Sequence, residues 1–487
     1  MTADQTIIAA LLTPLAGALA ILAAGRIHQN LREAVTFGTA ALLIFFVWSL
    51  LPDLLSGLRP GFTLTEIMPG IEIAFAVEPL GMLFAALASG LWLVNSLYSV
   101  GYMRANGEQN QTRYYALFAI SLMATIGIAF AGNLFTLFLF YEVLTLATYP
   151  LVSHKGDPAT VRSARTYLGL LLATSIGLFL PAIIWTYAVA GTGDFTSGGV
   201  LQQTDLDGFW VLVLLGLFVF GIGKAAVMPV HRWLPAAMVA PTPVSALLHA
   251  VAVVKAGVFA VVKIIVYIFG VDYLFELPGS IWLTWAAAIT IILASLMALR
   301  QTNLKRLLAY STVSQLSYVV MAAAVLKPLA EIGAAIHMAA HALGKITLFF
   351  AAGALYTAAK ITETRDLKGI GRRMPWTMAA FTIGALSMIG VPPTGGFVSK
   401  WYILAGAFQA ESYAAILTVI LSTVLNAAYF LPLVYMAWFE QPDRKDVREA
   451  PLPMVIALTF TGLATLAFFF FNAPVIELER QLLESAA

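Results

Sequence analysis

The sequence predicts an all-α polytopic membrane protein, and three observations support this fold class. Of the 487 residues, 60% are hydrophobic and only 11% are charged, whereas a soluble domain carries about 25% charged residues. Apolar stretches of about 20 residues, the length of a helix that crosses a bilayer, recur along the whole chain. Lysine and arginine gather in alternate connections between these stretches. A water-soluble fold would not hide this much apolar surface.

We place about fourteen transmembrane helices along the chain. The N-terminal stretch has no basic segment ahead of its apolar residues, so we interpret it as the first retained helix and not as a signal peptide. The longest connection, about 53–78, contains Pro and Gly and is expected to form a small extramembrane cap. The predicted spans are 5–25, 33–52, 79–101, 114–131, 133–153, 166–190, 208–229, 243–269, 279–299, 306–326, 331–357, 375–406, 412–438 and 452–471.

The positive charges predict the orientation of the chain. Cytoplasmic loops carry an excess of Lys and Arg, and here one set of alternate loops holds most of the 27 such residues. The other set, with the C-terminal tail, holds only Arg59, Lys327 and Arg480. The alternation keeps its phase through all the predicted spans. We therefore expect a multi-pass protein of the cell membrane with both termini on the outer side.

Proline residues at or near membrane depth predict broken helices in spans 7, 8 and 12. Proline removes a backbone donor and clashes with the preceding turn. Such a break survives in lipid only where protein or a water-filled cavity satisfies the freed backbone groups. Pro and Gly are also common in membrane helices in general, which is the less specific interpretation. The candidate break residues are Pro229 in span 7, Pro241 and Pro243 in span 8, and Pro392 and Pro393 in span 12.

The breaks in spans 7 and 12 suggest an internal repeat. The two spans are five apart, and each carries a lysine, Lys224 or Lys400, beside its break. Interrupted helices at corresponding positions of two halves are typical of inverted-repeat transporters. The expected domains are a three-helix segment (1–112), an inverted pair of five-helix repeats covering spans 4–8 (113–270) and spans 9–13 (271–440), and a final helix with a short tail (441–487).

The most informative residues are the ionisable groups inside the predicted spans. A charge at mid-bilayer costs about 2.5–3.5 kcal/mol on insertion scales, so a set of such groups indicates a role in transport and favours a proton relay. Histidine titrates near neutral pH, and lysine gives up its proton more readily in a dry pocket. The candidate relay residues are Glu142, Lys224, His249, Lys255, His337, His341, Lys345 and Lys400.

Residue spacing suggests how parts of this relay are arranged. Glu142 is the one acid well inside a predicted span, and we expect an ion pair with Lys224 because a lone buried carboxylate is paired or protonated. The residues His337, His341 and Lys345 follow at intervals of four and share one helix face. They cover roughly 12 Å of membrane depth.

Other positions leave alternatives open. His249 and Lys255 are six residues apart and face different sides of an ideal helix, unless a local bulge realigns them. Lys263 lies nearer the outer end of span 8, where snorkelling and a functional role are equally compatible with the sequence. A static ion pair at Glu142 and ordinary core histidines in span 11 are the structural interpretations.

The composition also excludes several classes of function. The chain has no cysteine, which rules out disulfides, zinc–thiolate sites and cysteine-ligated iron–sulfur clusters. The histidines of span 11 are accompanied by a lysine, a poor metal ligand, so no metal site is predicted. The net charge is +2 without a long basic run, so no nucleic-acid partner is expected. We expect no cofactor and no redox chemistry in this chain itself.

Several sequence segments resemble a known superfamily. The segments are LFLFYEVLTLATYPLV, GIGKAAVMPVHRWLPAAMVAPTPVSALLHA, RLLAYSTVSQLSYV, HMAAHALGKITLFFAAG and GVPPTGGFVSKW. They are similar to the proton-conducting antiporter-like subunits of respiratory complex I, membrane-bound hydrogenases and Mrp-type cation/proton antiporters. The resemblance covers spans 4–13 and implies fourteen helices with an inverted repeat. The functional residues that it implies are Glu142 in span 5, Lys224 in span 7, Lys255 or His249 in span 8, and Lys400 in span 12.

Within the superfamily, the length, the number of spans and Lys400 most resemble the D-type component of the Mrp-type multisubunit Na⁺/H⁺ antiporter. Only about sixteen residues follow Phe471, so the long lateral helix of some superfamily members is not expected. The resemblance implies proton movement beside other hydrophobic subunits, with Na⁺ moving through those partners. The alternative is a proton-pumping subunit of a complex I-type NADH:quinone oxidoreductase or membrane-bound hydrogenase.

Overall fold

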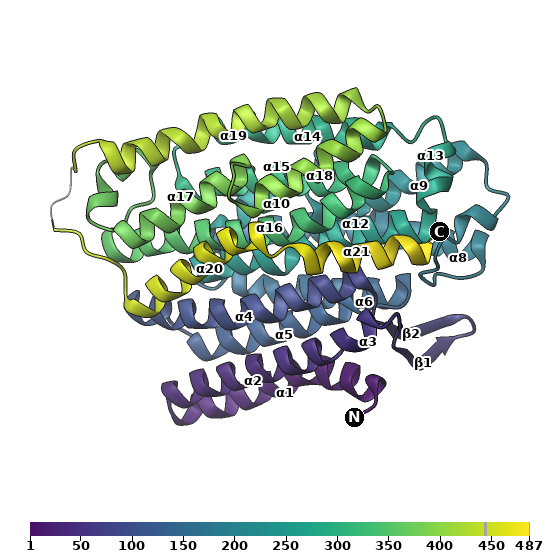
Figure 1. Ribbon diagram of the computed structural model, residues 1–487. Helices are drawn as coiled ribbons and strands as arrows, with labels where there is room; N and C mark the ends of the chain where they lie inside the picture. Colours follow the sequence, from purple (N-terminus) through teal and green to yellow (C-terminus); the bar gives the residue numbers. More distant parts are fainter. Residues whose placement is uncertain (443–445, 487) are drawn as a thin grey trace.

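Long helices run side by side through the structure, a computed structural model that describes residues 1–442 and 446–486 (Figure 1). Eleven helical segments are long and apolar enough to cross a membrane, and they coincide with predicted spans 1–6, 9–11, 13 and 14. Their helices are α1 (Ala3–Ile27), α2 (Gln29–Ser49), α3 (Leu51–Leu55), α4 (Pro79–Ala105), α5 (Gln111–Ala129), α6 (Leu134–Val152), α7 (Pro158–Thr174), α8 (Leu180–Ala190), α14 (Trp282–Leu299), α15 (Leu304–Ala324), α16 (Pro328–Ala359), α19 (Tyr413–Phe439) and α20 (Leu452–Phe470).

The remaining three predicted spans are interrupted, as the sequence predicts, and this is why none of their helices reaches spanning length. Span 7 consists of α9 (Gly208–Gly221) and short helical turns that include η3 (Gly223–Ala225), η4 (Val230–Arg232), α10 (Trp233–Ala236) and η5 (Ala237–Val239). Span 8 consists of α11 (Thr242–Ala246), the π-helical turn η6 (Leu247–Val251), α12 (Val253–Ile264) and η7 (Ile265–Phe269). Span 12 is divided into α17 (Pro375–Ile389) and α18 (Gly395–Gln409). The inverted repeat itself stays a prediction.

The prolines do not all cause the interruptions assigned to them. Pro392 and Pro393 lie between α17 and α18, where the break is expected. Pro229, however, follows a break that starts earlier, because α9 already ends at Gly221. In span 8, Pro241 and Pro243 stand at the start of α11, where a missing backbone N–H costs nothing. The irregular part of that span is η6 instead, which is a correction to the predicted break.

The freed backbone groups at the break in span 7 are satisfied by side chains. The backbone N–H of Lys224 donates to the hydroxyl of Tyr141 at 3.1 Å. The indole of Trp233 donates to the carbonyl of Gly223 at 2.8 Å. Buried polar backbone therefore finds partners within the protein, as a break inside a membrane requires.

The connection between α3 and α4 contains an antiparallel hairpin of β1 (Gly61–Met68) and β2 (Ile71–Ala76). The fold is therefore not wholly α, and the expected cap is a small sheet. Its β-branched and aromatic residues favour strands. The N–H of Gly132 donates to the carbonyl of Ala74 at 2.8 Å, so the hairpin is tied to the junction between α5 and α6.

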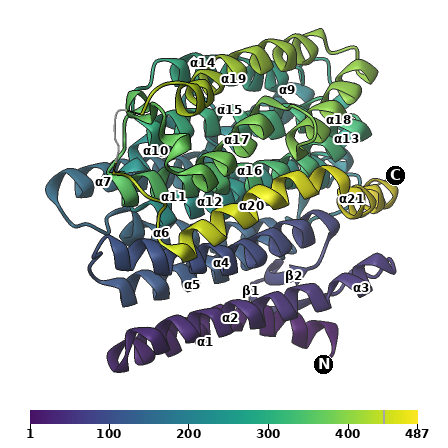
Figure 2. The ribbon, with the colours of Figure 1, turned by 60° about the vertical axis from the view of Figure 1, so that its left-hand side comes forward.

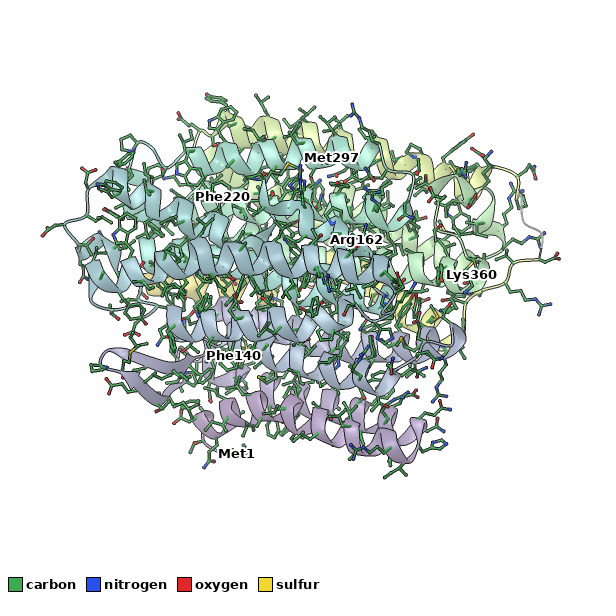
Figure 3. All side chains as sticks on the ribbon, turned by 180° about the vertical axis from the view of Figure 1, so that it is seen from behind. Met1, Phe140, Arg162, Phe220, Met297 and Lys360 are labelled. Atoms are coloured by element: carbon green, nitrogen blue, oxygen red, sulfur yellow. The ribbon has the colours of Figure 1, made fainter. Side chains whose placement is uncertain are left out.

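The centre of the bundle is formed by α15 and α16, which are buried along almost their whole length. Helices α1 and α2 lie at one edge, and α14 and α19 lie at the opposite edge (Figures 1 and 2). A last helix, α21 (Ala473–Ala486), follows α20 and packs on α4 and α16. Both chain ends lie at the end of the bundle that carries the hairpin (Figure 1), whereas Lys360 lies at the opposite end (Figure 3).

Glycines allow the interrupted spans to pack closely against their neighbours. A Cβ on Gly257 of α12 would lie 2.2 Å from the backbone nitrogen of Ala225, in the turn that carries Lys224. A Cβ on Gly396 of α18 would lie 1.8 Å from the carbonyl oxygen of Ser387 in α17. Only a residue without a side chain fits at these two contacts.

We expect Gly257→Ala to lower the thermal stability of the protein, because the added methyl group would meet backbone atoms that have no room to move. Overpacking of this kind costs about 1–3 kcal/mol. Thermal unfolding of the purified protein in detergent measures the effect. The matched control is Gly216→Ala in α9, where no atom lies within 4 Å of the added Cβ. Equal melting temperatures for the two variants would contradict this packing.

Candidate functional site

Most of the predicted relay residues lie buried inside the bundle. None of the residues Lys224, Lys255, His337, His341, Lys345 and Lys400 is more than 6% exposed. Glu142 of α6 is partly buried. His249 falls in η6, but its side chain lies outside the described part of the structure, so its role stays a prediction.

Lys224 is held by oxygen atoms of α6 and not by an ion pair. Its Nζ donates to the carbonyl of Tyr141 at 2.7 Å and to Thr145 Oγ1 at 2.6 Å. It also lies 3.1 Å from the centre of the Tyr141 ring, a favourable site for a cation. The lysine turn η3 packs against α12 through Gly257, which fixes the direction of the side chain.

The expected ion pair between Glu142 and Lys224 is wrong for this arrangement. The ion pairs found among the described residues do not include Glu142, although its charge acts on Lys224 through space. Glu142 follows Tyr141 and so points about 100° away around α6. One of its carboxylate oxygens is buried without a hydrogen-bond partner among the described residues.

Lys255 and His341 form a direct contact between α12 and α16. The Lys255 Nζ lies 2.8 Å from His341 Nδ1. The backbone just before α12 is distorted, with φ −107° and ψ −71° at Ala252, because η6 inserts a wider π turn. Such turns are often found at functional sites. This is the local bulge that the sequence left open as an alternative.

His337 connects α16 to α18. Its Nδ1 lies 2.9 Å from the hydroxyl of Ser399, the residue before Lys400. Its ring stacks on Tyr318, with centroids 5.4 Å apart, and lies 6.1 Å from the ring of His341. The Nε2 atom is buried and has no hydrogen-bond partner among the described residues. The Ser399 contact therefore holds one nitrogen of this imidazole, and the donor or acceptor role of each nitrogen follows from the tautomer.

Lys345 turns away from the histidines and contacts α15. Its Nζ donates to Ser311 Oγ at 2.7 Å. The same hydroxyl accepts from Tyr429 of α19 at 3.1 Å, and Tyr429 in turn bonds to Asn426. A chain of neutral polar groups thus leads from Lys345 towards α19.

The same chain continues to Lys400. The side-chain amide of Asn426 donates to the carbonyl of Met388 at 3.3 Å, and this carbonyl also accepts from Lys400 Nζ at 3.2 Å. The Lys400 Nζ further donates to the carbonyl of Ile389 at 2.8 Å and to Thr423 Oγ1 at 3.2 Å. The two carbonyls end α17, where the break in span 12 leaves them without helical partners.

The three titratable residues of α16 each contact a different neighbouring element. His337 contacts α18, His341 contacts α12 and Lys345 contacts α15. The rings of His337 and His341 also stack on each other, and all three side chains are buried as expected. Their action as one relay stays a prediction.

Two polar residues of this network were missed by sequence reasoning. Asn426 and Tyr429 belong to α19, whose other faces are largely apolar and exposed at the edge of the bundle. Together with Ser422 they form a buried polar stripe at intervals of four and three residues. Such a stripe on an apolar helix is a signal in the sequence, because polar side chains in lipid turn towards protein partners.

Lys263, for which the sequence left two alternatives open, is buried and ion-paired. It does not snorkel, since it is 0% exposed and its Nζ lies 3.1 Å from Glu78 Oε2 at the start of α4. The same ammonium donates to the carbonyl of Ala131 at 2.6 Å. It thereby ties α12 to α4 and to the α5–α6 junction, which is the beginning of the helix that carries Glu142.

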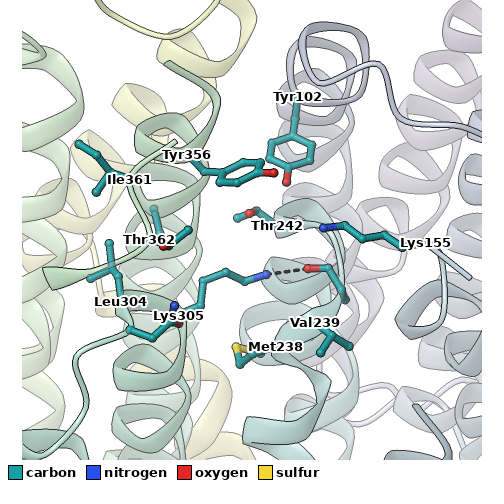
Figure 4. A pocket seen from close by; sticks show the side chains of 13 residues that line it. Tyr102, Lys155, Met238, Val239, Thr242, Leu304, Lys305, Tyr356, Ile361 and Thr362 are labelled. Atoms are coloured by element: carbon teal, nitrogen blue, oxygen red, sulfur yellow. Dashed lines mark hydrogen bonds between the residues drawn. The ribbon is translucent and has the colours of Figure 1, made fainter. Parts of the chain in front are cut away.

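A cavity of about 220 Å³ opens at the end of the bundle near Lys360 (Figure 4). The Lys305 ammonium on its wall donates to the carbonyl of Ala240 at 2.6 Å. Burial raises the pKa of nearby Glu108, while Lys305 and two further lysines act in the opposite direction. The lining residues are Tyr102, Lys155, Met238, Val239, Ala240, Thr242, Asn303, Leu304, Lys305, Ala352, Tyr356, Ile361 and Thr362.

The fold and the buried lysines define the class: a polytopic membrane protein that encloses ionisable groups in its helix bundle. Comparison with known proteins then gives the family. Residues 131–426 match the transmembrane family described as NADH:quinone oxidoreductase/Mrp antiporter, and the chain belongs to this family.

Relatives of both kinds are found. The chain is 32% identical to NADH-quinone oxidoreductase subunit N of Desulforudis audaxviator, over 84% of this chain and 83% of that protein. It is 31% identical to the A-type component of the Na⁺/H⁺ antiporter of Alkalihalophilus pseudofirmus, over 82% of this chain but only 53% of that protein. The chain thus spans about half the length of this antiporter relative.

A solved structure supports the fold along the whole chain. A chain in the structure of the Mrp complex from Dietzia sp. DQ12-45-1b matches with a TM-score of 0.87 and 21% identity. The match covers 99% of this chain and 97% of that one. The predicted fold class is confirmed.

We expect Lys263→Met to destabilise the protein strongly, because it leaves the carboxylate of Glu78 buried without its cation. Breaking one side of a buried pair costs about 3–5 kcal/mol. Thermal unfolding in detergent is the measurement. The double variant Lys263→Met/Glu78→Gln should recover much of the loss, and Lys327→Met, whose ammonium stacks on Phe275 without an ion pair among the described residues, is the control. A single variant as stable as the control would contradict the assignment.

Proposed function

We propose that this chain is the proton-translocating subunit of a multisubunit monovalent cation (Na⁺)/proton antiporter in the cell membrane. The observation that carries the proposal is the set of buried lysines bonded to carbonyls, hydroxyls and an imidazole. A lysine held by neutral groups releases its proton without leaving a carboxylate unpaired, which would be costly in a dry interior. A change in the protonation of these buried lysines therefore costs less free energy than the breaking of a buried ion pair.

The contacts suggest a route for the protons. The floor of the cavity at Ala352 lies two turns of α16 from Lys345, a rise of about 10 Å, and gives access from the lysine-rich end. Glu142 and Lys224 form a second point of access in the first half of the chain. The contact of Lys255 with His341 joins the two halves.

Lys400 is the proposed point of exchange with the other side. It is reached from Lys345 through the polar groups of α15 and α19, and from His337 through Ser399. We propose that the cavity lies on the cytoplasmic side, a position that the lysine-rich loops support by the positive-inside rule. Both termini then lie on the outer side, in agreement with their common position at the opposite end (Figure 1).

The proposed ion for this subunit is the proton and not Na⁺. Hard cations prefer several oxygen ligands, and we expect the same of Na⁺. Ammonium groups repel a cation because they carry the same charge. The buried set is mainly basic, with Glu142 as its one acid. We propose that Na⁺ passes through partner subunits, and that these partners are other hydrophobic chains of a complex of the Mrp type, in which this chain takes the place of the D-type component.

A second candidate function is favoured by one comparison. The match to an NADH-quinone oxidoreductase subunit N extends over most of both chains, unlike the match to the antiporter relative. The alternative is therefore a proton-pumping subunit of a redox-driven complex. Mass spectrometry of proteins that co-purify in mild detergent separates the two. Partners without cofactors would support the antiporter, whereas iron–sulfur, flavin or nickel partners would overturn it.

We expect Glu142→Gln and Lys224→Ala each to abolish proton transport while the complex still assembles. The first removes a titratable group and the second removes the ammonium held by α6. Sodium-dependent proton exchange in inverted vesicles is the measurement, with assembly checked by native gel. Full exchange in either variant would contradict the relay.

We expect Tyr429→Phe to slow proton transport roughly threefold to tenfold, the effect of losing a hydrogen bond of about 0.5–1.5 kcal/mol. The change interrupts the chain between Lys345 and Lys400 at a single hydroxyl. Tyr435→Phe is the matched control, because Tyr435 lies in the same helix and is 60% exposed. Transport that is unchanged in Tyr429→Phe would argue against this branch of the route.

A further inference from the structure

Two acids at the outer end of the bundle are buried and do not belong to the relay described above. Glu331 lies in the first turn of α16 and is 4% exposed, and Glu479 lies in α21 and is 2% exposed. Among the described residues, no hydrogen-bond donor reaches either oxygen of Glu331 or the Oε1 of Glu479. The two carboxyl groups are close enough for the charge of one to act on the other.

The position of Glu331 relative to the relay follows from the packing of α16 and α18. His337 opposes Ser399 through a hydrogen bond. Further out, a Cβ on Gly333 would meet Ile403 and a Cβ on Gly406 would meet Ala330. Helices α16 and α18 are thus antiparallel, and the same pairing of facing residues continues along their contact.

This register places Lys400 level with residue 336 of α16. Glu331 is therefore five residues further towards the outer end, a rise of roughly 8 Å. It is the next titratable group along α16 beyond Lys400. The acid thus lies between the last lysine of the relay and the outer surface.

The helix α21 covers this position. Glu479 and its neighbour Leu478 are buried, while Glu477 and Arg480 on the other face are exposed. The helix packs on α4 and α16, and Gln481 anchors it to α3 by donating to the carbonyl of Leu55 at 3.2 Å. The buried face of an otherwise solvated helix therefore presents an acid to Glu331.

The charged neighbours do not neutralise the two acids. Arg59 acts on Glu78 and Tyr267, and its guanidinium donates to the carbonyls of Leu54 and Leu58. From α13 (Val271–Glu276), Asp272 adds a further negative charge near Glu331. From α4, Glu78 is already paired with Lys263, and Tyr267 of η7, near Glu479, hydrogen-bonds to Glu78. The ammonium of Lys327 stacks on a phenylalanine ring instead.

We propose that Glu331 and Glu479 form an electrostatically coupled carboxyl pair that takes up and releases protons between Lys400 and the outer water. This inference rests on the proposed function. Two buried carboxyl groups without a cation hold a proton between them, because both cannot ionise side by side. Burial, reinforced by the charge of Glu331, raises the pKa of Glu479 to about 8.

The proton step is balanced in either direction. In the outward direction an N–H bond of the Lys400 ammonium breaks and an O–H bond forms on the pair, through intervening water. Lys400 is left neutral and the pair gains one proton. Release of a proton from the pair to outer water restores its starting state.

The test combines infrared spectroscopy with transport, on the purified complex. The carboxyl stretch of the protonated pair should be present at neutral pH and disappear as the pH rises through about 8, because a raised pKa keeps the acid protonated up to that value. Glu479→Gln should remove this signal, and Glu331→Gln should lower the pH at which it disappears, because the charge of Glu331 adds to the effect of burial on Glu479. The control Glu477→Gln, an exposed acid of the same helix, should keep it.

In vesicles, each of the two variants should slow proton exchange roughly tenfold or more, in the range of a lost acid–base group, and the control should not. A signal that is absent, that survives Glu479→Gln, or that disappears at an unchanged pH in Glu331→Gln would overturn the pair. So would loss of the signal on addition of Na⁺ at constant pH, which would make the pair a cation site. The infrared signal reports on the pair whether or not Glu142→Gln abolishes transport, so failure of this inference is distinguishable from failure of the proposed function.

Discussion

The structure depends on one constraint, which is that an ammonium group enclosed in a dry helix bundle must find oxygen or nitrogen partners. Water is the usual partner, and the interior replaces it with carbonyls, hydroxyls and an imidazole. Regular helices have few carbonyls to spare, since each is used within the helix. The interrupted helices and the serine, threonine and tyrosine side chains supply the rest. The breaks in spans 7 and 12 and the polar faces of α15 and α19 thus serve the same purpose, which is to provide partners for buried ammonium groups.

The break in span 12 shows this most directly. Lys400 takes two carbonyls that the end of α17 leaves without partners, and a threonine of α19 supplies a third oxygen. In span 7 the roles are reversed. The interrupted span carries the lysine, and the intact helix α6 supplies a carbonyl and a hydroxyl. The same requirement is met by different acceptors in the two halves.

The fold follows from the sequence to a large extent, because hydropathy and the phase of the positive charges depend on the bilayer and not on packing. They locate the eleven helices among the described residues that are long enough to span a membrane. Clustered prolines point to the three interrupted segments, whereas the single prolines Pro14, Pro150 and Pro432 lie inside regular helices. The position of each interruption depends on local packing instead. The π turn at Leu247–Val251 contains no proline that would predict it. The hairpin forms in a connection whose Pro and Gly do not predict strands.

The partners of the lysines were harder to predict than the lysines themselves. Neutral residues such as Tyr429 are common in membrane helices, so the polar stripe of α19 indicates a face that contacts protein but does not identify its partners. Glu78 and Glu331 stand at helix starts and resemble interfacial residues until tertiary contacts bury them. Glu142 was correctly located inside span 5, but a neighbouring residue, Tyr141, is the one that contacts Lys224. The direction of a side chain around its helix decides such contacts, and it is set by packing.

The close glycine contacts between α16, α17 and α18 also bear on the rate of proton transport. Helices that interlock at Gly333, Gly396 and Gly406 have little room to slide past one another, so we expect them to move as one unit. The parts that we expect to move within this unit are lysine stems, hydroxyl groups and histidine rings. Rotation of a side chain displaces far fewer atoms than a domain hinge, which takes microseconds to milliseconds. Helix rearrangement therefore does not limit the rate of a proton path that relies on side-chain motion. Slower steps elsewhere in the assembly set its turnover.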